Sequence, residues 1–190
     1  MLRNKTAPAL LLALSVFSVA PAGLGAKSSA LTVFEPKTHS FSCRIPADWA
    51  AFEDSEPWGE AVHILGPEGP TGAYRTGIDI HRMESGKPGF VSLLRLIKHI
   101  RRTDAQTKRA VGAVQRLHAA SGLARFVEVR ESRYLPAETA PSREETLHHY
   151  IGFIEDGSGY FMIKLSASEE VYLDYREDFL ELVKSFRPSS

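Results

Sequence analysis

Hydrophobic and polar residues alternate along much of the chain, which is the pattern of strands with one buried face. The segment 112–119 fits either a helix or a strand, and the turn at Ser121-Gly122 directly after it favours a strand. Glycine and proline end several of the alternating runs, as Gly66-Pro67 does. The runs that predict strands are 31–35, 40–45, 60–65, 75–82, 123–129, 146–155 and 160–165.

Two segments change to the period of a helix. In the first, 90–102, the predicted buried stripe is Phe90, Leu93, Leu94, Ile97 and Ile100. The second runs from a predicted N-cap at Ser168 to about Phe186, with Pro188 just beyond it. Its predicted buried stripe is Val171, Tyr175, Phe179, Leu182, Val183 and Phe186.

Short turns connect the predicted strands, which favours antiparallel pairing. The turn Asp156-Gly157-Ser158-Gly159 places two glycines where a hairpin needs positive φ values. We therefore predict an α/β fold of the α+β type, with a central, mostly antiparallel sheet of about six or seven strands sandwiched by helices.

Two stretches resemble a known family. The run FSCRIPADW (41–49) is similar to the opening of PsbP-like proteins, and GYFMIKLSA (159–167) is similar to their last strand before the closing helix. PsbP-like proteins are extrinsic photosystem II subunits and their bacterial relatives, and the Ran-GTPase-binding Mog proteins share the fold. The resemblance implies a sheet between helices, with Trp49 and Phe186 as core anchors, and a non-enzymatic role in binding or assembly. It implies no particular partner, because members of one fold bind different partners.

The first 26 residues have the order of a secretory signal peptide. Arg3 and Lys5 precede an apolar run over 9–17, and small residues follow it. Cleavage after Ala22 or after Ala26 satisfies the small-residue rule. We therefore predict an exported bacterial relative of the PsbP-like proteins, periplasmic or secreted, with a single domain over 27–190.

Charge and cysteine content narrow the function. The whole chain holds 23 Lys and Arg and 23 Asp and Glu, so its balance does not favour nucleic acid as a partner. Cys43 is the only cysteine, so no disulfide forms within the chain. It alternates with Phe41 and Ile45, which predicts a buried thiol in the core.

No phosphate-binding loop, nucleophile elbow or His-Glu-x-x-His helix occurs in the sequence. We therefore expect that the protein has no enzymatic activity and binds no cofactor. The one open alternative is a small-ligand or divalent-metal site. Asp79 and His81 share a strand face, and either His148 or His149 would join them if the two strands were neighbours.

Charge is segregated between the two helices. The segment 95–109 carries seven basic residues if His99 is counted, whereas the closing helix region is rich in acids. The basic segment is either a solvated helix surface or a docking surface, and a docking surface would bind an acidic protein partner or an anionic membrane. The predicted partner-binding residues are Arg95, Lys98, Arg101, Arg102, Lys108 and Arg109.

Overall fold

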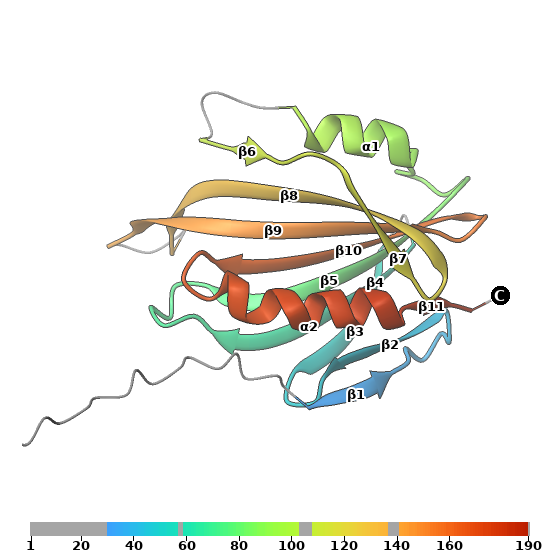
Figure 1. Cartoon of the computed structure of the whole chain (residues 1–190), viewed down its shortest axis with the longest axis horizontal. Helices are drawn as coiled ribbons and strands as arrows, with labels where there is room; N and C mark the ends of the chain where they lie inside the picture. The colour runs from blue at the N-terminus through green and yellow to red at the C-terminus, as the bar shows by residue number, and fades with distance from the viewer. Residues whose placement is uncertain (1–29, 57–58, 103–107, 137–140, 190) are drawn as a thin grey trace, which may run out of the picture.

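The computed structural model describes residues 30–56, 59–102, 108–136 and 141–189, and the predicted signal peptide lies outside them. An eight-stranded antiparallel sheet forms the centre of the molecule (Figure 1). In spatial order its strands are β3 (Ala50–Glu56), β4 (Gly59–Glu68), β5 (Arg75–Glu84), β10 (Gly159–Ser168), β9 (Arg143–Glu155), β8 (Gly122–Leu135) and β6 (Ala110–Val111), while β7 (Gln115–Ala119) also pairs with β8.

A helix and a small sheet share one face of the large sheet. The helix is α2 (Tyr172–Ser185), and the small sheet has the order β1 (Leu31–Phe34), β2 (Phe41–Pro46) and β11 (Arg187–Pro188). Phe186 stacks on Phe41 with a ring-centroid distance of 4.9 Å and meets Phe161 of β10 edge-on at 5.0 Å. One hydrophobic core therefore joins the two sheets and the closing helix.

The opposite face is covered only in part. There α1 (Leu93–Ile100) inserts Leu93, Ile97 and Ile100 onto strand residues of β8 and β9. The half of this face that β3 and β4 form stays open, since Phe52 is 54% exposed and Leu65 is 38% exposed. The predicted antiparallel sheet is confirmed, but the fold is richer in sheet than a sheet sandwiched by helices.

Several predicted details were wrong. Strand β3 was not predicted, because its sequence, AAFEDSE, is mostly exposed and does not alternate. Ser168 is not the N-cap of α2, because it is still paired with Leu147 of β9, and Val171 precedes the helix instead. Leu94 is 75% exposed, because the short helix α1 buries only positions three and four residues apart on one side.

Candidate functional site

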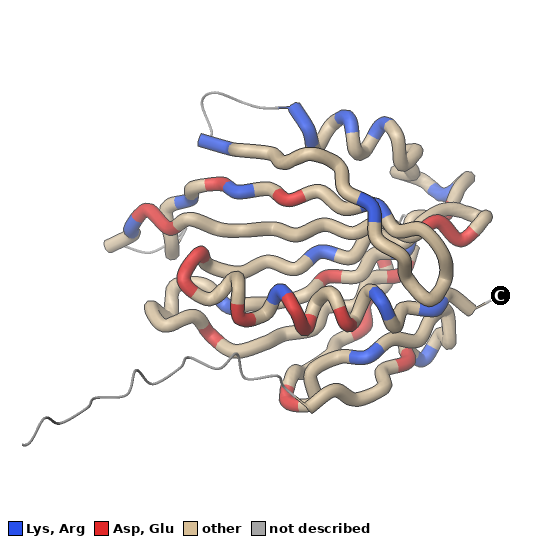
Figure 2. The backbone as a smooth tube through the Cα atoms, viewed as in Figure 1, with Lys and Arg blue, Asp and Glu red and all other residues tan. Residues whose placement is uncertain are grey.

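The exposed side of α1 carries a basic surface. Its four cations are Arg95, Lys98, Arg101 and Arg102, and all four are exposed. They face outwards because Leu93, Ile97 and Ile100, on the other side of α1, are buried against the sheet. Figure 2 shows the resulting blue segments along α1, whereas red segments predominate along α2. We call these four residues the α1 basic surface.

No carboxylate among the described residues forms an ion pair with the α1 basic surface. The other two predicted partner-binding cations differ in this respect. Lys108 lies 2.6 Å from Glu144, and Arg109 lies 3.9 Å from Glu131, so both are held against strands β9 and β8. The six predicted residues therefore divide into two that form ion pairs and four that form none with a carboxylate of the described residues.

A groove of about 510 Å³ borders the α1 basic surface. Val91 and Leu96 supply apolar lining, and the stems and charges of Arg95, Lys98, His99 and Arg102 surround them. The exposed side chain of Leu94 lies on the same helix. The surface therefore offers apolar contact area together with positive charge, as protein-binding sites commonly do.

The structure does not bring the four predicted metal ligands together. Strand β10 lies between β5, which holds Asp79 and His81, and β9, which holds the two histidines. His149 shares the face of Asp79, whereas His148 points to the opposite face and stacks on Tyr172 at 4.5 Å. Among the described residues, no group of three or more His, Cys, Asp and Glu side chains is arranged to hold a metal ion.

Asp79 instead belongs to a polar cluster that the sequence analysis missed. Its carboxylate lies 2.9 Å from His63 Nδ1 and 3.0 Å from Lys164 Nζ, across the two neighbouring strands. Burial favours the protonated carboxyl, but Lys164 and His63 outweigh it, so the pKa of Asp79 is lowered. For His81, in contrast, burial lowers the pKa, and the nearby Asp79 carboxylate acts in the opposite direction. The ammonium group of Lys164 thus takes the place beside the Asp79 carboxylate that a bound metal ion would need.

A second polar network connects three residues of the same sheet face. His149 Nδ1 lies 2.8 Å from Ser166 Oγ, and its Nε2 lies 3.3 Å from Glu131 Oε1. Burial lowers the pKa of His149, although Glu131 opposes this shift. Glu131 is also held by Arg133 at 2.5 Å.

This network contains the residue types of a serine hydrolase triad, but its serine hydroxyl is not accessible to a substrate. Ser166 is only 5% exposed and lies within a strand that is paired on both sides, with β5 and with β9. Backbone amides in such a strand are committed to the sheet, which leaves no oxyanion-binding donors beside the hydroxyl. Both ring nitrogens of His149 are engaged, so the network fixes the positions of three strands.

The thiol of Cys43 is as inaccessible as the hydroxyl of Ser166. Cys43 is 3% exposed, as the sequence predicted, and burial raises its pKa to about 12. A thiol with such a pKa contains almost no nucleophilic thiolate at neutral pH.

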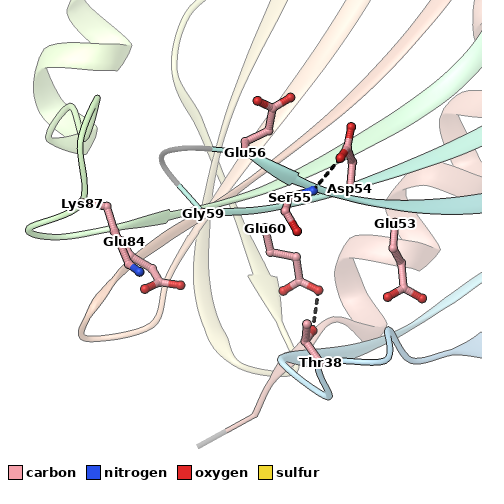
Figure 3. Close-up of a pocket in the computed structure, with 9 residues that line it drawn as sticks. All are labelled: Thr38, Glu53, Asp54, Ser55, Glu56, Gly59, Glu60, Glu84 and Lys87. Atoms are coloured by element: carbon pink, nitrogen blue, oxygen red, sulfur yellow. Dashed lines mark hydrogen bonds between the residues drawn. The ribbon is translucent and has the colours of Figure 1, made fainter.

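An acidic hollow of about 380 Å³ lies at the end of β3 and β4 (Figure 3). Glu60 accepts hydrogen bonds from Thr38, at 2.5 Å, and from Ser40. Lys87 is the one cation among the described residues that line the hollow, which also include Glu53, Asp54, Glu56 and Glu84. Negative charge is therefore concentrated in this hollow, whereas the α1 basic surface is positively charged.

No helix within the described ranges is long and apolar enough to cross a membrane.

Comparison with known proteins gives structural similarity only. No family model matches the chain, and no curated protein gives a significant match. Similar solved structures include the cyanobacterial PsbP protein CyanoP from Synechocystis, with 12% identity, a TM-score of 0.47, and coverage of 90% of this chain and 98% of that one. A variant of the protein Mog1 has 11% identity and a TM-score of 0.49, over 84% of this chain and 96% of that one.

A third similar structure is LpqN from Mycobacterium tuberculosis, which is described as involved in cell envelope biogenesis. It has 9% identity and a TM-score of 0.45, and the match covers 86% of each chain. Both families that the sequence resembles, PsbP-like and Mog, are thus present among the similar structures. At identities of 9–12% and TM-scores of 0.45–0.49, the likeness is one of chain architecture and assigns no family, activity or partner to this chain.

Proposed function

We propose that this chain is an exported, non-catalytic binding or assembly protein that docks an acidic protein partner on the α1 basic surface. The observation that carries the proposal is the set of four exposed cations, Arg95, Lys98, Arg101 and Arg102, without an ion pair among the described residues. Like charges gathered on a short helix and the two residues that follow it repel one another, and a partner with the opposite charge relieves that repulsion.

The ion pairs that Lys108 and Arg109 form support the choice of the α1 basic surface as the docking site. Lys108 and Arg109 follow in the chain and form ion pairs with Glu144 and Glu131, so the domain neutralises these cations locally. No carboxylate within the described ranges neutralises the α1 basic surface in this way, and the surface borders the groove that Val91 and Leu96 line. Charge brings a partner to the surface, and the apolar groove supplies area that is buried on docking.

The test is affinity capture with a charge-reversed variant. The purified protein is used to capture partners from the envelope fraction of its native cells, beside the variant Arg101→Glu/Arg102→Glu. We expect captured proteins to be lost with the variant and to be acidic. A matched control, Arg44→Glu/Arg116→Glu, makes the same change in net charge at two other exposed arginines and should leave capture unchanged.

Two outcomes would refute the proposal. Capture by the Arg101→Glu/Arg102→Glu variant at the wild-type level would show that the α1 basic surface is not the docking site. Unchanged protein capture together with lost binding to vesicles of anionic phospholipid would assign the surface to a membrane instead.

A further inference from the structure

The large sheet has one long unpaired edge. Among the described strands, β3 is the outermost on its side of the sheet and pairs with β4 alone, over seven residues from Ala50 to Glu56. At the other end of the same sheet the outermost strand, β6, has only two residues. An edge strand presents a row of backbone N–H and C=O groups that a further strand can pair with.

The outward-facing amides of β3 can be identified. The N–H of Ser55 donates to the side chain of Asp54 at 2.7 Å, so this amide points away from β4. Because hydrogen-bonding direction alternates along an antiparallel strand, the amides of Glu53 and Ala51 point outwards as well. Neither of these two amides donates to any group outside the strand ladder among the described residues.

The side chains along this edge define the chemistry of a matching strand. Glu53 projects on the face of α2, because it is paired with the buried Val62, whereas Phe52 and Asp54 project on the open face. Neither Glu53 nor Asp54 forms an ion pair with a described cation. The 54% exposed ring of Phe52 lies one residue before Glu53 and two residues before Asp54, on the same face as Asp54. A strand alongside β3 would therefore meet negative charge on both faces and an aromatic ring on one.

A second copy of this chain does not match that chemistry. Pairing of two β3 strands would place the carboxylates of Glu53, Asp54 and Glu56 close to those of the other copy, and like charges across strands are destabilising. Lysine or arginine side chains at the same positions would instead gain cross-strand attraction, and their aliphatic stems would cover Phe52.

We propose that β3 is a docking edge for an extended, lysine- or arginine-bearing segment of a partner protein, which adds to the sheet as a further strand. Main-chain hydrogen bonds supply affinity in this mode of recognition, and alternate side chains supply specificity. The inference uses residues that are distinct from the α1 basic surface, so it stands or fails independently of the proposed function.

The probe is a fluorescently labelled synthetic peptide as long as β3, with lysine and valine in alternation. Its binding to the purified protein is followed by fluorescence anisotropy at low ionic strength, beside a peptide with glutamate in place of lysine. We expect saturable binding of the lysine peptide, weakened by added salt, and binding of the glutamate peptide weaker by about tenfold or more.

Two variants separate strand addition from simple charge attraction. Ser55→Pro removes an outward amide at an edge position that tolerates proline, and should weaken binding of the lysine peptide by about tenfold or more. Glu53→Lys/Asp54→Lys should reverse the preference, so that the glutamate peptide binds better. The matched control, Glu170→Lys/Asp174→Lys, changes two exposed acids beside α2 and should retain the wild-type preference.

Equal binding of the two peptides, or binding of neither, would overturn the proposal. So would wild-type affinity in a Ser55→Pro protein whose circular dichroism shows that it is folded. If Ser55→Pro does not fold, hydrogen exchange of the wild-type protein decides the question. Slower exchange of the Ala51 and Glu53 amides with bound peptide supports strand addition, and unchanged exchange refutes it.

Discussion

Phe186 connects three parts of the core, and its replacement by alanine tests whether they form one cooperative unit. The side chain is fully buried and contacts Phe41 of the small sheet and Phe161 of the large sheet. Truncation of a buried phenylalanine costs about 3–5 kcal/mol, a range that includes the loss of ring–ring contacts. We expect the free energy of unfolding to fall by about 4 kcal/mol, a large fraction of the total for a domain of this size.

The measurement is urea unfolding followed by circular dichroism. The midpoint should shift while the dependence on urea stays constant, because the same surface is exposed on unfolding. Leu173→Ala is the control on the adjacent helix: this side chain is 73% exposed, and its loss should change stability by less than about 0.5 kcal/mol.

A double-mutant cycle isolates the stacked pair. Phe186→Leu and Phe41→Leu retain most of the apolar volume, so their coupling reports the ring–ring contact and should be about 0.5–1.5 kcal/mol. The reasoning is refuted if Phe186→Ala costs less than about 1 kcal/mol, since a cost that small lies below the range for buried aromatic truncation. Zero coupling would show that the two rings stabilise the core separately.

Three further predictions concern buried positions. A Cβ added at Gly152 would lie 2.8 Å from the ring of Phe126, so Gly152→Ala should cost about 1–3 kcal/mol in urea unfolding, and an unchanged midpoint would contradict the packing. Cys43 should resist iodoacetamide at neutral pH in the folded protein and react after unfolding, because burial raises its pKa to about 12; rapid labelling of the folded protein would contradict this. Acid should destabilise the fold through His149, because its pKa is lower in the folded than in the unfolded chain. Its contribution is complete above the unfolded pKa of about 6.5 and is lost as the pH falls towards the folded value. His149→Gln should therefore flatten the dependence of stability on pH below about 6.5, and an unchanged slope would count against the shift.

The sequence predicts the buried strands well because their faces alternate in polarity. Strands β2 and β5 bury alternate residues over much of their length, and hydrophobic periodicity detects that directly. Strand β3 buries no side chain fully, so periodicity has nothing to detect there. The strand exists because its backbone pairs with β4, and such pairing leaves little trace in composition.

The polar clusters were only partly predictable, for a related reason. Asp79 and His81 share a face because they are two residues apart on one strand, which the sequence shows. Their partners come from other strands, and only the register of the sheet places His63 and Lys164 beside Asp79. The order β5, β10, β9 is likewise a property of topology, so the separation of Asp79 from His149 could not be read from spacing along the chain.

The pairing of β11 with β2 has a consequence for how the domain forms during synthesis. Arg187 pairs with Ser42, and Pro188 pairs with Phe41, so the small sheet combines residues from nearly opposite ends of the described chain. Contacts of such long sequence separation form late and slow the folding of a domain. The ribosome therefore releases β2 long before β11, one of its two partner strands, exists, and the last contacts of the small sheet must wait for the synthesis of β11. During that interval the apolar face of β2 lacks the cover of α2 and Phe186, and transiently exposed apolar surface of this kind promotes aggregation.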